Sequence, residues 1–477
     1  MHRPLHSLIF ALVLFSGFGA LSFLFPEGGI TLGKDLLLSY PSLDDVIGNT
    51  KKTKDISEVL KTLSEVDTSF ILTDTQEVGV EAPPETKAPK LITGIQMSDP
   101  DALTDFFESL KNIKDNKSAV RVLHYGDSQI EGDRMTDYLR LKLQGQFGGS
   151  GPGLISLMPL TQHVGYRVTP DGDEWDRYNV FTAKDKRVSH KNYGVMAGFC
   201  RFKGYEDFDP REQPSQAGFK LQNKAGGYSK IRLFYGGARS RTWCEYYDGP
   251  ALIHADSLES GGYFHWHDFE VSKGSPEQSF QFTGTDSPDF YGMSLEGDGG
   301  VMVDNLAMRG SSGTFFHLIN NAQLREFYKL FNVKLIILQF GGNTLPALRD
   351  SAMAVNYAGY MRSQISLVKK MAPGASILFI GPSDMSVKSG TEYITYPLLE
   401  KLRDELKKVV LSSGCAFFDL YDCMGGKNSM PAWVEQKLAA SDYTHFSPKG
   451  ARQMATFLYG SLINEYKSFL KQDKGTN

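Results

Sequence analysis

The sequence predicts an α/β protein whose parallel sheet is interrupted by an all-β region. Apolar runs of strand length alternate with amphipathic helical patterns before residue 150 and again after residue 299. Between residues 151 and 298 glycine, aspartate, serine and aromatic residues become frequent, and helical windows become scarce. The 477 residues are enough for a large core and an accessory module.

The N-terminal part of the chain predicts contact with a membrane. Residues 7–25 are uncharged and apolar, and they approach the roughly 20 residues that a spanning helix needs. Arg3 precedes this segment and acidic residues follow it, which predicts that everything downstream is exported. An uncleaved anchor and a cleaved signal peptide over residues 1–26 both fit the sequence. Residues 27–95 have weak apolar periodicity and a proline-rich stretch at 81–90, which predicts a tether.

The first strand of the core is predicted at residues 119–125, after a helix that starts near Ser98. A short polar turn with Ser128 follows this strand, and the next helix is predicted from Arg134. A hydroxyl between a strand end and unpaired helix N–H groups suits a nucleophile. The alternative is an ordinary helix cap formed by Asp127 and Ser128.

The later part of the chain predicts more strands of the same sheet. Sheets built from such alternation are parallel and covered by helices, and their functional residues lie at the carboxyl ends of the strands. The inserted region contains alternating, half-buried strand patterns, which predicts a β-sandwich over residues 151–298. The predicted core strands are 301–303, 333–340, 376–380 and 416–420, and the predicted helices are 314–330, 357–371, 396–411 and 448–469.

Residues downstream of Ser128 fit the other parts of a serine-dependent site. Asp442 precedes His445 by three residues, so one turn of chain can place the carboxylate against one ring nitrogen and leave the other for Ser128. Asn343 follows a predicted strand and can donate to an oxyanion, and Gly310 can add a backbone N–H. Taken singly, these residues also fit a surface loop and two ordinary turns.

The order Gly126-Asp-Ser128, Gly310, Gly341-Gly-Asn343 and Asp442-x-x-His445 resembles the four sequence blocks of the SGNH (GDSL) hydrolase family. The resemblance covers residues 119–160 and 300–470. It implies a flavodoxin-like three-layer core, made of residues 96–150 and 299–470. It also implies Ser128 as nucleophile, His445 as general base and acid, Asp442 as its orienter, and an oxyanion hole made by Asn343 and the N–H groups of Gly310 and Ser128.

A finer resemblance concerns the substrate. Gln129 stands where some relatives carry His or a hydroxyl residue, and with Asp127 it is a candidate for substrate contact. Residues 129–133 and 148–153, followed by the β-rich insertion, look like the branch with bacterial peptidoglycan O-acetylesterases, whose inserted domain resembles a carbohydrate-binding module. This implies an exported esterase of the periplasm or cell envelope that removes O-acetyl groups from a glycan, with peptidoglycan favoured and no cofactor or metal.

Two other functions fit the same residues: an O-acyltransferase with the same triad, and a tethered glycan-binding protein without activity.

Aromatic residues of the insertion could stack on sugar rings or belong to its core. His265 and His267 share one face of a predicted strand, but the sequence offers no third metal ligand. The aromatic candidates are Trp243, Tyr246, Tyr247 and Trp266.

Charge and cysteine content limit the remaining possibilities. The net charge of -4 and the pI near 6.2 give no electrostatic case for a nucleic-acid partner. Cys415 with Cys423, and Cys200 with Cys244, are close enough in sequence for disulfides, and free buried thiols are the alternative.

Overall fold

The computed structural model describes residues 3–25, 30–31, 37–38, 53–62, 94–114, 119–161, 163, 165–172, 175–205, 209, 211–223, 227–272 and 275–475. Most of the predicted tether, including the proline-rich stretch 81–90, lies outside the described residues. The N-terminal segment forms helix α1 (Arg3–Leu24). In the part of the chain that the structure describes, no helix is both long and apolar enough to cross a membrane.

A six-stranded sheet forms the centre of the core, with the strand order β16-β4-β17-β18-β21-β3. Its first five strands are parallel, and β3 pairs antiparallel with β21 at one edge. The predicted parallel sheet is therefore confirmed. The bounds are β3 Ile95–Gln96, β4 Val120–Gly126, β16 Val301–Ala307, β17 Val333–Gln339, β18 Ser376–Ile380 and β21 Ala416–Phe418.

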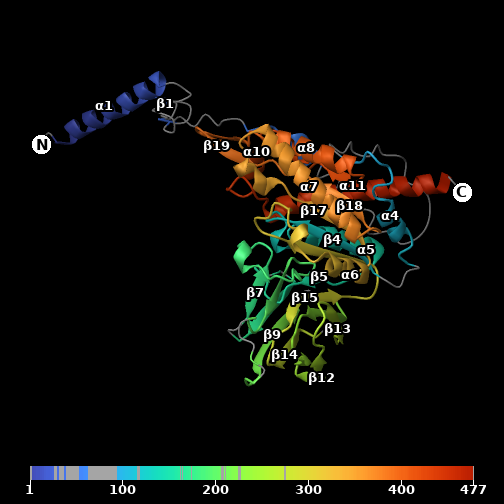
Figure 1. The fold of residues 1–477 in the computed structure, drawn as a ribbon. Helices are drawn as coiled ribbons and strands as arrows, with labels where there is room; N and C mark the ends of the chain where they lie inside the picture. The colour runs from blue at the N-terminus through green and yellow to red at the C-terminus, as the bar shows by residue number, and fades with distance from the viewer. Residues whose placement is uncertain are drawn as a thin grey trace.

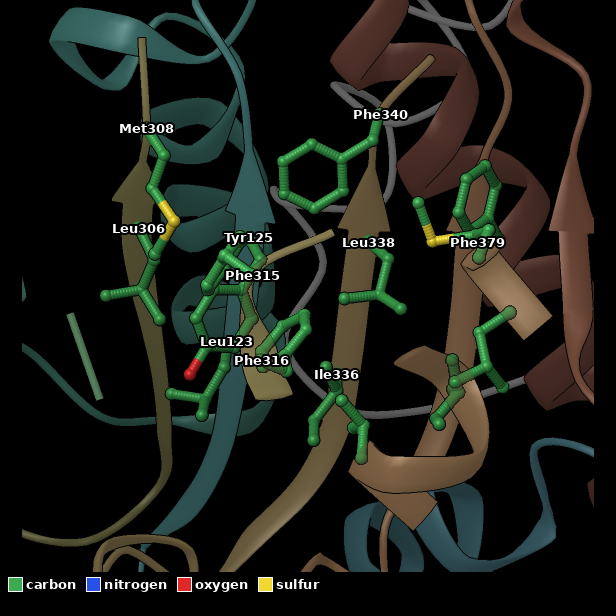
Figure 2. Close-up of a cluster of buried hydrophobic side chains, with 14 of the residues drawn as sticks. Leu123, Tyr125, Leu306, Met308, Phe315, Phe316, Ile336, Leu338, Phe340 and Phe379 are labelled. Atoms are coloured by element: carbon green, nitrogen blue, oxygen red, sulfur yellow. The ribbon is translucent and has the colours of Figure 1, made fainter. Parts of the chain in front are cut away.

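Alternate residues of these strands contribute to two apolar clusters. Leu123 and Ile336 pack in one cluster with α6, α7 and α8, whereas Val122 and Leu335 pack in the other with α4, α5 and α11. Figure 2 shows the first cluster, where side chains of β4, β16 and β17 lie beside Phe315 and Phe316. The helices are α4 Thr104–Lys111, α5 Thr136–Phe147, α6 Asn321–Leu330, α7 Ser351–Met371, α8 Leu399–Ser412, α9 Leu420–Cys423, α10 Ser429–Glu435 and α11 Pro448–Gly475.

The predicted all-β region forms two further antiparallel sheets, which Figure 1 shows as a group below the core. One sheet has the order β13-β10-β15-β8-β7, with β5 on β15, and the other has the order β12-β11-β14-β9-β6. Apolar residues of both sheets share one cluster. The bounds are β5 Gly153–Ile155, β6 Tyr166–Asp171, β7 Asp176–Asn179, β8 Gly198–Arg201, β9 Ser215–Asn223, β10 Lys230–Gly236, β11 Thr242–Asp248, β12 Ala251–Leu258, β13 His265–Glu270, β14 Glu277–Gly284 and β15 Asp289–Glu296.

Four predicted helices begin later than the sequence pattern suggests: those expected near Ser98 and from residues 134, 314 and 396 begin at Thr104, Thr136, Asn321 and Leu399. The structure shows the cause of two of these late starts. Gly132 and Asp133 have positive φ angles of 68° and 66°, so a 3-10 turn η1 (Glu131–Asp133) precedes α5 and the predicted start at Arg134 is wrong. The predicted helix 314–330 is divided, because the Asn320 side chain accepts from the N–H groups of Ala322 and Gln323 and caps α6 there. Ser128 therefore lies in a turn and not at a helix N-terminus.

Part of the predicted tether packs on the core. Ile56 and Val59 are buried in the cluster that contains Met424, and the Lys54 ammonium donates to the carbonyl of Lys427 at 3.0 Å. The tether prediction is therefore wrong for residues 53–62, which pack on the core through apolar and polar contacts. All four cysteines are free and buried. Of the two alternatives that the sequence allowed, disulfides or free thiols, the structure has free thiols.

Candidate active site

The ends of three neighbouring strands bring the predicted site residues to one edge of the sheet. The predicted residues Asp127 and Ser128 follow β4, Asn343 follows β17, and the predicted Gly310 follows β16 together with Ser311, which the sequence does not single out. The last residue of β4 is Gly126, where a Cβ would lie 2.8 Å from the Ile130 side chain, so the close approach of Ile130 favours glycine. Since β16, β4 and β17 are adjacent and parallel, their carboxyl ends meet.

Ser128, His445 and Asp442 form a continuous hydrogen-bonded chain. The Ser128 hydroxyl Oγ lies 2.7 Å from His445 Nε2, and His445 Nδ1 lies 2.8 Å from Asp442 Oδ2. These residues are 317 and 3 positions apart in sequence. The structure therefore brings all three predicted members of the triad together.

The hydrogen bonds define which ring nitrogen of His445 carries the proton. An ionised carboxylate only accepts, so Asp442 requires a proton on Nδ1 and leaves Nε2 as an acceptor for the Ser128 hydroxyl. Burial raises the pKa of Asp442, but hydrogen bonds from the backbone N–H and ring of His445 and from the Thr444 N–H outweigh it and hold the pKa below its usual value. Asp442 stays ionised and fixes the imidazole.

Asn343 lies beside Ser128, but its amide already has partners. Asn343 Nδ2 donates to Asp127 Oδ2 at 3.0 Å and to the Ser311 carbonyl at 3.1 Å. An amide nitrogen has two hydrogens, so a third acceptor would have to share or replace one of these.

Gly310, with a φ of 73°, is exposed and is not among the described residues that line the pocket at Ser128.

Asp127 supports Asn343 from inside the protein. Its Oδ1 accepts from the Gln129 N–H at 2.9 Å and its Oδ2 accepts from Asn343, so both carboxylate oxygens are used internally. Burial raises the pKa of Asp127 to about 6, although these hydrogen bonds and the charges of His445 and Arg134 oppose the increase. A buried carboxylate with a raised pKa beside a triad is a common sign of a functional site.

The raised pKa of Asp127 predicts a specific pH dependence of stability. The folded-state pKa of about 6 lies above the ordinary value of 3.8, so the stability that protonated Asp127 provides at acid pH is lost as the pH rises through 6. Relative to Asp127→Asn, wild type should lose about 2 kcal/mol of unfolding free energy between pH 4 and pH 7. Urea titrations of both proteins at several pH values measure this difference, and a constant difference would contradict it.

Two residues hold the His445 loop through contacts that the sequence does not reveal. The side-chain amide of Gln129 donates to the Thr444 carbonyl at 2.6 Å, and Arg134 Nη1 donates to the Phe446 carbonyl at 3.3 Å. The sequence makes Gln129 a candidate for substrate contact, but its amide is bound within the protein. No local sequence signal marks either contact, because the loop lies more than 300 residues away.

Two cavities of different size open at these strand ends. A pocket of about 20 Å³ lies at Ser128, and a cavity of about 350 Å³ lies where the end of β16 faces the insertion. The small pocket is lined by Asp127, Ser128, Gln129, Gln339, Phe340, Gly342, Asn343, Gly381, Pro382, Ser383, Met385, Thr444 and His445.

The other candidates from the sequence have mixed environments. Tyr246 is fully buried, whereas the side chains of Trp243 and Trp266 are exposed. His265 Nε2 lies 3.0 Å from the Gly261 carbonyl. Within the described residues there is no group of three His, Cys, Asp or Glu side chains that could hold a metal ion.

Comparison with known proteins identifies solved structures with a similar fold. No protein-family model and no curated protein matches the sequence. Among solved structures, a peptidoglycan O-acetylesterase matches with a TM-score of 0.61 and 20% identity, over 78% of this chain and 99% of that chain. A family two carbohydrate esterase from Clostridium thermocellum has a TM-score of 0.24 and 11% identity over 54% of this chain and 97% of that chain. An acetyl xylan esterase has a TM-score of 0.27 and 13% identity over 34% of this chain and 81% of that chain. The first of these matches extends over both the core and the insertion, so the chain shares the overall fold of that solved structure.

Proposed function

We propose that the chain is a serine esterase that removes O-acetyl groups from a cell-envelope glycan, with peptidoglycan the favoured substrate. The observation that carries the proposal is the chain of contacts from Ser128 Oγ to His445 Nε2 at 2.7 Å and from His445 Nδ1 to Asp442 at 2.8 Å. A serine hydroxyl is a weak nucleophile until a base takes its proton. The geometry supplies that base already oriented.

In the proposed reaction, Ser128 Oγ attacks the ester carbonyl carbon while His445 Nε2 takes the hydroxyl proton. The C–O bond to the sugar then breaks, and His445 returns the proton to the leaving sugar oxygen. Water attacks the acetyl-enzyme with His445 again as base, which releases acetate and restores Ser128. Asp442 stabilises the imidazolium through the Nδ1 hydrogen bond. No cofactor takes part in these steps.

The two cavities support a small acyl group and a large alcohol. The pocket at Ser128, with about 20 Å³, holds little more than one or two water-sized groups, which suits an acetyl methyl. The cavity of about 350 Å³ is within the range of small-ligand sites and suits a sugar unit. Its lining combines apolar and polar groups, among them Tyr178, Phe181, Asn179, Arg177, Met308 and Thr161.

The identity of the glycan, the cellular location of the protein and the layer arrangement of its core are parts of the same proposal. Peptidoglycan is favoured because the solved structure with a TM-score of 0.61 is a peptidoglycan O-acetylesterase. Export to the bacterial periplasm or cell envelope is supported by the uncharged apolar segment 7–25, as a signal peptide or an anchor. We take the core to be flavodoxin-like and three-layered, with the insertion as a β-sandwich that contributes to glycan binding.

The test is acetate release by the full chain from an aryl acetate and from O-acetylated wall fragments. The proposal expects acetate from both, and deacetylated fragments by mass spectrometry. Excess glycan acceptor should not suppress free acetate; if it does and acetylated sugar forms instead, the chain is an acyltransferase. Glycan binding without release of acetate from either ester would indicate a binding protein.

Asn343 should contribute as an oxyanion donor. During attack, the negative charge on the carbonyl oxygen can compete with the neutral Ser311 carbonyl for an Asn343 N–H, because hydrogen bonds to ionised acceptors are stronger. Asn343→Ala should therefore lower kcat by about 10²- to 10³-fold with little change in KM.

A matched control for this variant is Asn320→Ala, which removes the N-terminal cap of α6 and does not change a residue that lines the pocket at Ser128. The control should cost about 1 kcal/mol of stability and leave kcat unchanged. Steady-state kinetics of both variants on the aryl acetate measure the difference. An effect of Asn343→Ala below a few-fold would remove Asn343 from the oxyanion hole.

A further inference from the structure

We propose that Gln129 is the positioning residue of the catalytic base: its side-chain amide holds the loop of His445 at the distance at which Nε2 reaches Ser128. This inference rests on the proposed function. Gln129 Nε2 donates to the Thr444 carbonyl at 2.6 Å, and Gln129 Oε1 accepts from the Phe446 N–H at 3.4 Å. These are the peptide groups immediately before and after His445.

A primary amide is suited to this position because it carries a donor and an acceptor side by side. The Thr444 carbonyl and the Phe446 N–H offer the complementary pair, so Gln129 binds the loop much as a neighbouring strand would. The same amide nitrogen also lies 3.3 Å from the Ser383 hydroxyl. The Gln129 amide is already hydrogen-bonded within the protein and its side chain is only 8% exposed. Few of its hydrogen-bonding groups are therefore accessible to a substrate.

Gln129 also connects the two halves of the site by the shortest covalent path. It follows Ser128 directly, and its backbone N–H donates to Asp127 Oδ1 at 2.9 Å. The turn that carries the nucleophile and the amide that holds the base are thus one rigid unit. Arg134 provides a second connection, with its guanidinium bound to the carbonyls of Ser128 and Phe446.

The His445 loop needs such support because several of its other contacts are on the solvent side. The Asp442 side chain is 50% exposed, and Tyr443 has a φ of 55°, which is unfavourable for a residue with a side chain. The Ser386 N–H donates to the Tyr443 carbonyl at 3.0 Å, and Tyr393 stacks on Tyr443. Within the described residues, Gln129 is the side chain that binds both the carbonyl before the imidazole and the N–H after it.

The experiment compares Gln129→Glu and Gln129→Ala with wild type in the full chain. At pH 8 the new carboxylate of Gln129→Glu presents an acceptor to the Thr444 carbonyl and repels it, so kcat should fall by about 10²-fold, as for a catalytic group displaced by about 1 Å. KM should stay within about twofold, since neither change removes a substrate contact. Gln129→Ala should lower kcat to a similar extent at every pH.

The pH profile separates positioning from a general loss of structure. A protonated glutamic acid is nearly isosteric with glutamine and can again donate to the Thr444 carbonyl. The ratio of kcat for Gln129→Glu to that of wild type should therefore rise as the pH is lowered from about 8 to about 5, whereas the ratio for Gln129→Ala should stay constant. Each ratio compares the variant with wild type at the same pH.

Gln323→Glu is the matched control. Gln323 is buried and also binds a carbonyl and an N–H, those of Tyr263 and Gly194, each at 2.8 Å. This change should lower the melting temperature and leave kcat as it is. Hydrogen–deuterium exchange of the peptide around His445 should be faster in the two Gln129 variants than in wild type and the control.

The outcomes distinguish the inference from the proposed function. A wild-type chain that releases no acetate overturns the proposed function. An active wild type with both Gln129 variants within a few-fold of its kcat overturns the positioning role, even if exchange in the loop is faster. An equal loss of kcat in Gln323→Glu also overturns it, because the effect would then be general.

Discussion

Ser128→Ala should lower kcat for acetate release by at least about 10⁴-fold, because a triad without its nucleophile retains only binding and oxyanion stabilisation. The hydroxyl is the atom that His445 Nε2 contacts at 2.7 Å, and no other described hydroxyl is hydrogen-bonded to that nitrogen. Folding should change little, since Ser128 is only half-buried and its hydroxyl makes no contact that holds two elements together apart from His445.

A covalent probe makes this prediction specific to one serine. A fluorophosphonate should label Ser128 in the wild-type chain and leave Ser383 unlabelled, although both line the small pocket. Ser363→Ala, on the exposed face of α7, should keep full activity. Acetate release that survives in Ser128→Ala would exclude the triad as the catalytic site, whereas label on Ser383 would move the nucleophile to the segment after β18.

The sheet and the triad could be predicted because their signals are local. The parallel strands are mostly apolar runs such as that of β17, and Ser128 and Asn343 follow directly at strand ends, while Asp442 and His445 stand three residues apart in one short motif. Parallel strands bring such ends to one edge. The order of four short motifs therefore carries information that no single motif carries.

The supporting contacts could not be predicted because they join distant residues. The role of Gln129 depends on a loop that returns from 317 positions away in sequence, and the Asn343 amide is engaged by Asp127, 216 positions away. The start of α5 depends on backbone angles at Gly132 and Asp133 that no periodicity expresses. The short hairpin β19–β20 (Ser386–Ser389 and Glu392–Thr395) likewise has no clear strand pattern in the sequence.

Asp304→Asn should destabilise the protein by about 3–5 kcal/mol, because it leaves the buried guanidinium of Arg121 without its main counter-charge. Arg121, on β4, binds both carboxylate oxygens of Asp304 on β16, at 2.6 and 2.9 Å. It also binds Glu296, on β15 of the insertion, at 2.8 Å. Burial lowers the pKa of Arg121, but the charges of Asp304 and Glu296 outweigh it and raise the pKa, so Arg121 stays charged. Denaturant unfolding at pH 7 measures the loss.

Asp268→Asn is the matched control, since Arg232 binds Asp268 with the same two-bond geometry, at 2.6 and 2.7 Å, on the surface of the insertion. Solvent and salt screen that pair, so its loss should cost about 1 kcal/mol or less. Similar losses for the two variants would mean that burial of the Arg121 pair does not matter.

Arg121 joins the strand that leads to Ser128, the strand that leads to Ser311, and the insertion beside the large cavity. Folded Asp304→Asn protein should therefore also show faster hydrogen exchange where β15 and β5 meet the core, because Asp304 Oδ1 accepts from the Leu154 N–H at 2.7 Å.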